Sequence, residues 1–250
     1  EGLAFLKGEG AIYPHKLCPE YSERFLRRAV EQFDRSEKPL RTLFSYAHFA
    51  KVNLDEAVLA MTNRAGLKPD VFLDSGAFSA ITMGIKIDLG AYCAWVHRWR
   101  HLVTEYAGLD VIGDHAASMR NIHEMERRGL DPLPTFHVGS PIEALRDIVQ
   151  EYDRIAFGGM VPHVRRDGFL LQWATAINRS LDRFLDGRPF TSHAFGVSRL
   201  TEVIRQLRAS TCDSTTWAVL STYGDLPLWD ATRGKWAKRK DHGDALRSFG

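Results

Sequence analysis

The sequence predicts an α/β protein, and within that class a single-domain (β/α)8 TIM barrel. Short hydrophobic runs with β propensity alternate with amphipathic helical stretches, which is the pattern of a parallel sheet covered by helices. The length of 250 residues suits one such barrel, and no low-complexity linker divides residues 1–250. No GxGxxG pattern follows the first expected strand, which argues against a dinucleotide-binding doubly wound sheet.

The strands are expected where β-branched and aromatic residues form short runs. Gly, Pro, Asp or Ser bounds most of these runs and marks a turn at the strand end. The expected strands are 42–47, 71–75, 109–114, 133–139, 154–160, 192–197 and 211–219.

Helices are expected between these strands, because apolar residues recur there every three or four positions. The helix at 54–66 begins after Asn53, a good N-cap, and ends at Gly66. A second helix is expected at 89–108, after Asp88. Further helices are expected at 118–129, 140–152, 167–185 and 198–208.

Composition predicts a soluble cytoplasmic protein that does not contact a membrane. Cys18, Cys93 and Cys212 are odd in number and far apart, which disfavours a disulfide framework or a CxxC zinc site. No stretch approaches the roughly 20 apolar residues of a membrane span. The first residues, EGLAFLKGEGAIYPHK, lack the apolar core of a signal peptide.

Positive charge concentrates near the C-terminus. The formal net charge of +2 is too small to identify a nucleic-acid partner by itself. Within the basic segment 231–250, however, Lys235 and Lys238 flank Trp236, a combination that suits a phosphate backbone. A solvated basic tail explains the same cluster equally well.

Polar and small residues recur at the expected strand ends. The stretch VFLDSGAFSA runs from a buried strand directly into Asp74 and Ser75. In a barrel these ends form the active-site face. Taken singly, such acids can cap helices, histidines can be core residues and a Gly-Gly pair can form a turn. The other strand-end residues are Asp114, His115, His137, Gly158, Gly159, His193, Gly196, Asp213 and Ser214.

This set of residues suits chemistry at a sugar carbon. One carboxylate can attack the anomeric centre while a second carries a proton to the departing group. Strand-end glycines let the main chain approach a planar heterocycle, and a third acid can accept hydrogen bonds from a guanine-like edge. No HxH or HExxH spacing occurs, so we expect no metal site.

Several motifs resemble, in order, those of the tRNA-guanine transglycosylases. FLDSGAFS is similar to their DSGGFQ motif, IAFGGM to the Gly-Gly segment that holds the base, and HAFGVSRL to the glycine-containing segment that follows. TCDSTTW lies where those enzymes carry the nucleophilic aspartate. The ordered set, over residues 42–230, most resembles the DpdA-type branch that inserts 7-deazaguanine into DNA.

The resemblance implies a base-exchange reaction. Asp213 would form a glycosyl-enzyme ester and Asp74 would act as the acid and base. Guanine would leave and a 7-deazaguanine such as 7-cyano-7-deazaguanine would enter, with no cofactor. Ser75 and Asp114 would contact the base, Gly158 and Gly159 would present main chain to it, and His137 would lie beside the pocket in a role that is open.

Two departures from the tRNA enzymes favour DNA as the substrate. Those enzymes hold a structural zinc with three cysteines and a histidine near the C-terminus, whereas Cys212 is the only cysteine here beyond residue 93. We therefore expect neither a zinc subdomain nor stoichiometric zinc. The Gly-Phe-Gln of their motif is replaced by Ala-Phe-Ser, ending at Ser79.

A DNA substrate adds a further demand, because a stacked guanine has to be flipped out at a cost of roughly a few kcal/mol. Arg165 and Arg166 follow the Gly-Gly strand and suit phosphate contacts, although a solvated pair is equally consistent. Aromatic residues able to stack on a base are Trp217, Tyr223, Trp229 and Trp236, of which Trp217 and Trp229 also suit core packing.

Three alternatives remain open at the level of sequence. The same chemistry could act on tRNA. A barrel without catalysis could bind nucleic acid as part of a larger modification complex, although such a protein would have no chemical need for Asp74 and Asp213 together. A nucleoside hydrolase would use water in place of the incoming base. The sequence also leaves open whether partner proteins are needed.

Overall fold

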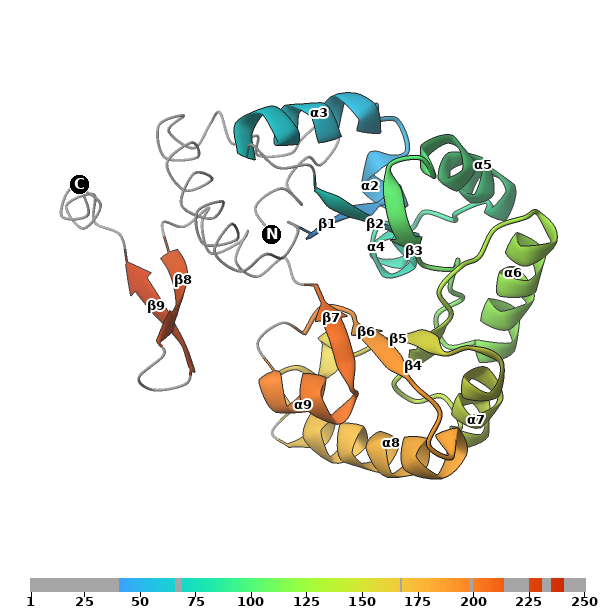
Figure 1. Cartoon of the computed structure of the whole chain (residues 1–250), viewed down its shortest axis with the longest axis vertical. Coiled ribbons are helices and arrows are strands. Elements are labelled where there is room, and N and C mark those ends of the chain that lie inside the picture. Colours follow the sequence, from blue (N-terminus) through green and yellow to red (C-terminus); the bar gives the residue numbers. More distant parts are fainter. Residues whose placement is uncertain are drawn as a thin grey trace.

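The computed structural model shows an α/β fold in which parallel strands alternate with helices (Figure 1). This confirms the α/β part of the prediction. The structure describes residues 41–65, 69–166, 168–197, 200–213, 225–230 and 235–240. The parallel strands are β1 (Arg41–Ser45), β2 (Asp70–Asp74), β3 (Val103–Tyr106), β4 (Thr135–His137), β5 (Arg154–Gly158), β6 (Thr191–Ala194) and β7 (Ala209–Cys212).

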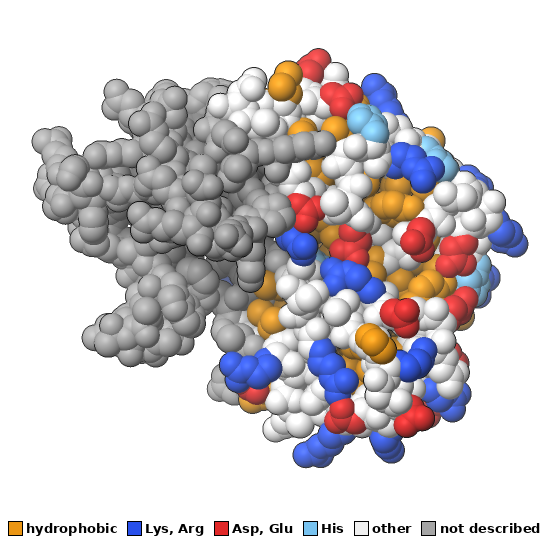
Figure 2. Space-filling view, in the orientation of Figure 1, with side chains coloured by type: hydrophobic (Ala, Val, Ile, Leu, Met, Phe, Trp, Pro, Cys, Tyr) orange, Lys and Arg blue, Asp and Glu red, His pale blue; other side chains and the backbone are white. Residues whose placement is uncertain are grey.

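Most of the helices form an outer layer around these strands (Figure 1). On the face shown in Figure 2, charged side chains of both signs are interspersed with hydrophobic ones. Within the described ranges, no helix combines the length and the apolar character needed to cross a membrane. The helices are α2 (Tyr46–Phe49), α3 (Leu54–Ala65), α4 (Ala77–Thr82), α5 (Leu89–Trp99), α6 (His115–Arg127), α7 (Ile142–Glu151), the 3-10 turn η2 (Val161–His163), α8 (Phe169–Leu185) and α9 (Thr201–Gln206).

The parallel strands follow one another in chain order. They form a three-stranded sheet, β1-β2-β3, and a four-stranded sheet, β4-β5-β6-β7. A parallel bridge between Ala107 and Leu133 joins the two sheets. The Gly108 amide donates to the Leu133 carbonyl at 2.9 Å, and the Leu133 amide donates to the Tyr106 carbonyl at 2.8 Å. The strands β1 to β7 therefore present their carboxyl ends at the same edge. The described strands do not close into a barrel.

One expected strand is wrong. Residues 109–114 form a loop, and the strand lies earlier, at Val103–Tyr106, inside the stretch predicted as helix 89–108. Helix α5 ends at Trp99, and the β-branched Val103 pairs with Val71 of β2. The loop contains Gly113 at φ +84°, a conformation that favours glycine. Pairing with β2 decided the position of the strand.

The C-terminal part of the chain forms a second kind of sheet. Strands β8 (Asp225–Asp230) and β9 (Lys235–Lys240) pair antiparallel, with Trp229 opposite Trp236. The predicted basic cluster of Lys235, Trp236 and Lys238 therefore lies on a strand.

The core consists of two apolar clusters, one for each parallel sheet. The first packs Phe44 and Leu73 of the strands against α5, where Tyr92 and Val96 are fully buried. The second packs the strands of the larger sheet against α7, α8 and α9. The buried Tyr92 hydroxyl donates to the Ala107 carbonyl at 2.7 Å, so α5 also holds the junction between the sheets.

Arg154 ties the two sheets together across the interior. It pairs with Glu105 of β3 through Nε and also through Nη2, which lies 2.8 Å from Glu105 Oε2. The same guanidinium donates to the hydroxyls of Ser210, at 2.8 Å, and Thr211, at 3.0 Å, on β7. One side chain therefore connects β5 with β3 and β7, and its five donors suit such a network.

An aromatic contact makes a second connection across the interior. The Phe72 ring of β2 stacks on the His193 ring of β6, with centroids 4.9 Å apart and planes 20° from parallel. Phe195 contacts both rings edge-on. Since β2 and β6 belong to different sheets, this stack fixes the distance between their carboxyl ends.

Loss of the Arg154 side chain is expected to weaken the fold. Arg154→Ala should lower the free energy of unfolding by about 1–3 kcal/mol, because Glu105 loses its partner while it stays partly buried. Chemical denaturation followed by circular dichroism measures this. The control is Arg146→Ala, since the exposed Arg146–Asp147 pair should contribute no more than about 0.5 kcal/mol. Equal losses in the two variants would contradict the role given to Arg154.

Candidate active site

The residues at the carboxyl end of β2 hold Asp74 in a defined position. The Gly76 amide donates to Asp74 Oδ2 at 2.9 Å. Gly76 has φ +70°, and a Cβ there would lie 2.3 Å from Ser45 Oγ, so only glycine allows this turn. Ser75, predicted to contact the base, is buried between them in the chain. The Asp-Ser-Gly sequence therefore folds back on its own carboxylate.

The environment of Asp74 shifts its acidity into the neutral range. Burial, followed by the negative charges of Asp213 and Asp110, raises the pKa of Asp74 to about 7. The Gly76 amide and the Ser45 hydroxyl act in the opposite direction and do not offset the increase. Near pH 7 this carboxyl group can therefore both donate and accept a proton.

Asp213 follows β7 and is held through one oxygen. The Gly196 amide donates to Asp213 Oδ1 at 2.8 Å, and His193 Nε2 lies 3.3 Å from the same oxygen. His193 is itself positioned by Thr211, whose hydroxyl lies 2.9 Å from Nδ1, and by its stack on Phe72. Within the described residues both contacts use Oδ1, which leaves Oδ2 for a substrate. The Asp213 side chain is 27% exposed.

Asp110 is a site residue that the sequence reasoning missed. Its Oδ2 lies 3.4 Å from Nε2 of His137, at the end of β4. Burial acts to lower the pKa of His137, but the hydrogen bond and charge of Asp110 prevail and raise it. Because Asp110 also raises the pKa of Asp74, the carboxylates of the β2, β3 and β7 ends form one electrostatic cluster.

Asp114, which was predicted to contact the base, lies at the N-terminus of α6 instead. Its exposed side chain accepts a hydrogen bond from the Ala117 amide at 2.9 Å and caps α6. The segment LDVIGD contains both acids. A strand at 109–114 would have placed Asp114 at its carboxyl end. The real strand stops at Tyr106, so Asp110 is the acid that lies at this edge of the sheet. Asp110 could have been predicted as a site residue only if the end of β3 had been placed at Tyr106.

The Gly158-Gly159 pair brings main chain close to His137. Gly158 pairs with His137 in the sheet, and a Cβ on it would lie 2.9 Å from His137 Cδ2 and from Thr135 Cγ2. Gly159 has φ +71°. A side chain at either position would displace the histidine or strain the turn. The structure therefore places both glycines next to the acidic cluster.

The residues predicted to contact nucleic acid fall in two places. Arg165 and Arg166 are exposed in the loop after β5, which leaves the sheet at the same edge as the carboxylates. The Arg166 guanidinium lies 5.8 Å from the centre of the Phe169 ring. Lys235, Trp236 and Lys238 lie on β9, and Trp229 on β8, where only the backbone is described; Trp217, Tyr223 and Ser214 lie outside the described residues.

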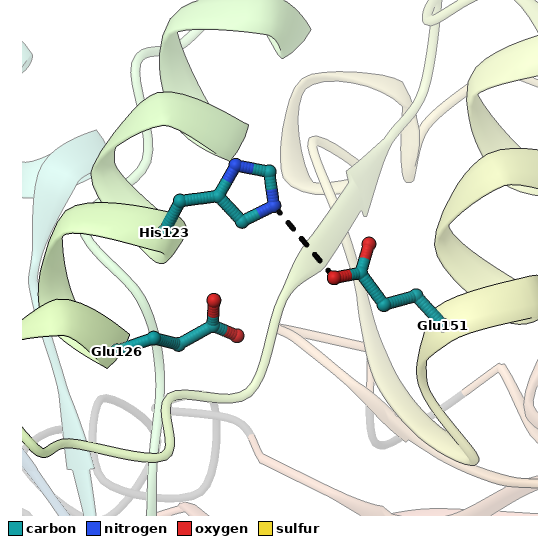
Figure 3. Close-up of side chains that lie close together, drawn as sticks. All are labelled: His123, Glu126 and Glu151. Carbon is teal, nitrogen blue, oxygen red and sulfur yellow. Dashed lines mark ion pairs between the residues drawn. The ribbon is translucent and has the colours of Figure 1, made fainter.

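A second polar cluster lies elsewhere, between α6 and α7 (Figure 3). His123 Nε2 is 3.8 Å from Glu151 Oε1, and Glu126 accepts a hydrogen bond from the Tyr152 hydroxyl at 2.6 Å. Glu151 ends α7 just before β5 begins, which places it at the amino-terminal edge of the sheet. An ion pair and a hydrogen bond account for these side chains, and they take no part in the candidate active site.

The raised pKa of Asp74 predicts a pH-dependent stability. Its pKa is about 7 in the folded protein and about 3.9 in an unfolded chain. Its stabilising contribution is therefore full below about pH 4 and is lost as the pH rises through 7. Asp74→Asn should gain roughly 2–4 kcal/mol in unfolding free energy relative to wild type between pH 5 and pH 8.

Urea denaturation at the two pH values measures this gain. Asp147→Asn, at an exposed acid, serves as the control and should show no such change with pH. A difference between wild type and Asp74→Asn that stays constant from pH 5 to pH 8 would contradict the assignment.

No known family identifies this chain. Neither the models of protein families nor the curated proteins give a match to it. The site combines a carboxyl group with a pKa of about 7, a second carboxylate held by a histidine and a main-chain amide, and a His–Asp pair beside two glycines.

Proposed function

We propose that the protein is a transglycosylase that replaces guanine in DNA with a 7-deazaguanine derivative, such as 7-cyano-7-deazaguanine. The feature that carries this proposal is the partly buried Asp74 carboxyl group, which accepts a hydrogen bond from the Gly76 amide and lies within the electrostatic reach of Asp213, with a pKa of about 7. One of these groups can exchange a proton at neutral pH, and the other can act as a nucleophile. Double displacement at a sugar carbon requires that division of roles.

In the first displacement Asp213 attacks C1′ of the target nucleotide through Oδ2. The C1′–Oδ2 bond forms as the C1′–N9 bond to guanine breaks, and protonated Asp74 gives its proton to the departing base. The Gly196 amide and His193 hold Oδ1, which keeps the attacking oxygen aligned. The product is a glycosyl ester with an intact sugar-phosphate chain.

In the second displacement the incoming 7-deazaguanine occupies the vacated pocket. Asp74, now ionised, takes the proton from N9 of the incoming base, N9 bonds to C1′, and the ester bond to Asp213 breaks. The shift of the Asp74 pKa to about 7 suits it to both steps. Each proton that Asp74 gives is recovered, so no cofactor is required.

The base is held by the polar groups next to this pair. Asp110 takes the role that the sequence reasoning assigned to Asp114, accepting hydrogen bonds from the amino and imino groups of the base. His137, with its raised pKa, donates to an acceptor on the same edge. Ser75 and the main chain of Gly158 and Gly159 complete the pocket.

We place this chemistry in a complete (β/α)8 barrel in the cytoplasm. The chain-order succession of parallel strands from β1 to β7 supports the barrel, as do the Arg154–Glu105 and Phe72–His193 contacts across the interior. Exposed Arg165 and Arg166 at the catalytic edge support a nucleic-acid substrate. The motif Ala-Phe-Ser, ending at Ser79, stands in place of the Gly-Phe-Gln of the tRNA enzymes and favours DNA over tRNA.

A base-exchange assay tests the proposal. Purified protein is incubated with radiolabelled guanine and, in separate tubes, duplex DNA, single-stranded DNA and unmodified tRNA. We expect label to enter DNA and not tRNA. Label in tRNA alone would keep the chemistry and replace the polymer. Absence of label from all three would contradict catalysis by the purified chain.

Replacement of Asp213 tests the nucleophile. Asp213→Asn should lower guanine incorporation by at least about 10³-fold and should remove any DNA adduct that survives a denaturing gel, because an amide cannot form the ester. Its circular dichroism spectrum should match that of wild type. Asp147→Asn, at an exposed acid, serves as the control and should keep full activity. Normal turnover by Asp213→Asn would exclude this mechanism.

A further inference from the structure

Exposed hydrophobic side chains are concentrated at the catalytic edge. Among the described residues, the exposed large hydrophobic side chains lie within 78–85 after β2, at 111–112 after β3, and within 161–164 and 169–171 after β5. The exception is Leu59 on α3. We call these four segments the apolar rim. On the face shown in Figure 2, charges of both signs are interspersed with hydrophobic side chains.

The apolar rim is continuous with the candidate active site along the chain. Val111 follows Asp110 directly, and the 78–85 segment begins four residues after Asp74. Val161 approaches the loop that holds Asp213, since a Cβ on Gly196 would lie 2.5 Å from Val161 Cγ2. A substrate that places one base among the carboxylates would therefore lay its neighbouring groups on the rim.

The exposure of these side chains is substantial. Ile81 is 58% exposed and Ile85 is 53% exposed. Exposed apolar side chains gathered around a candidate site are a usual mark of a binding surface. The rim therefore suits a ligand that brings flat or apolar groups to the catalytic edge.

Positive charge is interspersed with the apolar side chains. Lys86, Arg165 and Arg166 are exposed in or beside the same segments. The Phe169 ring lies under the Arg166 guanidinium and 4.9 Å from the ring of His163. The nearby acids Asp88 and Asp114 are engaged as helix caps. Apolar platforms combined with cations are the features that bind unstacked bases and phosphates of a single strand.

We propose that the apolar rim binds the bases that flank the target nucleotide in single-stranded DNA, while Arg165 and Arg166 contact its phosphates. The choice of ligand rests on the function proposed above, because it is the target base in the pocket that brings its neighbours to the rim. The rim then determines how tightly the strand binds, whereas the carboxylates determine the chemistry.

Paired substitutions at matched exposure test the rim. The variant Phe78→Ser/Ile81→Ser removes two rim side chains, and Leu59→Ser is the control because Leu59 is 59% exposed and lies outside the rim. Fluorescence anisotropy measures the affinity of each protein for a fluorescein-labelled single-stranded oligonucleotide that contains one guanine. Thermal unfolding confirms that both variants fold.

We expect the rim variant to bind the oligonucleotide at least about fivefold more weakly than wild type, from the loss of base stacking. Leu59→Ser should bind like wild type. At saturating DNA the rim variant should still incorporate radiolabelled guanine. Weaker binding with incorporation preserved supports the proposal.

Other outcomes separate the rim from the proposed function. Equal affinities for the rim variant and Leu59→Ser, in a wild type that exchanges guanine, would overturn the rim proposal alone. Rim-dependent binding without guanine exchange in any protein would support the rim and contradict the transglycosylase. Light scattering that shows the rim variant breaking an oligomer, with DNA affinity unchanged, would identify the rim as a contact between copies and overturn the proposal.

Discussion

The crowding of three carboxylates at one edge of the sheet is the constraint on which the rest of the site depends. Parallel strands bring their carboxyl ends together, so Asp74, Asp110 and Asp213 repel one another in a partly buried space. Each acid has a compensating group nearby. Asp74 accepts a hydrogen bond from the Gly76 amide. The pKa of Asp74 is raised to about 7, so this carboxyl group is partly protonated at neutral pH. The two others are held by histidines.

These compensating groups come from neighbouring strands, which couples the site to the fold. His137 of β4 serves Asp110, which follows β3, and His193 of β6 serves Asp213, which follows β7. The His193 ring also stacks on Phe72 of β2. A shift of one sheet relative to the other would therefore separate both the histidines and the acids. At the opposite end of the interior, Arg154 resists the same shift.

Much of the fold could be predicted from the sequence, because the periodicity of hydrophobic residues reports burial directly. Asn53 caps α3 by accepting from the Asp55 amide at 3.1 Å, as its position predicts. The failure at β3 has a physical cause. Residues 100–106 continue the apolar pattern of α5, and only pairing with β2 selects strand there. The exposed Val111 and Ile112 resemble a buried strand in composition alone.

The site could be predicted only in part. Asp74 ends β2, within one residue of the expected strand end. The strand expected at 211–219 instead ends at Cys212, which leaves Asp213 just beyond it. Both acids were assigned to strand ends from their polar neighbours, and the parallel topology brings those ends to one edge. Asp110 was missed because the error at β3 moved the strand end by several residues. The role of His193 depends on its contacts with Asp213 and Phe72, which join separate parts of the chain. The pKa of Asp74 likewise depends on burial and on distant charges, neither of which sequence spacing reveals.

Titration of Asp74 tests the central claim most directly. In protein labelled with ¹³C at the aspartate carboxyl groups, the Asp74 resonance can be assigned by its loss in Asp74→Asn. We expect a pKa of about 7 in wild type and a lower value in Asp213→Asn, where a repelling charge is removed. A pKa near the usual 3.9 in wild type, or the same pKa in both proteins, would contradict a coupled carboxylate pair.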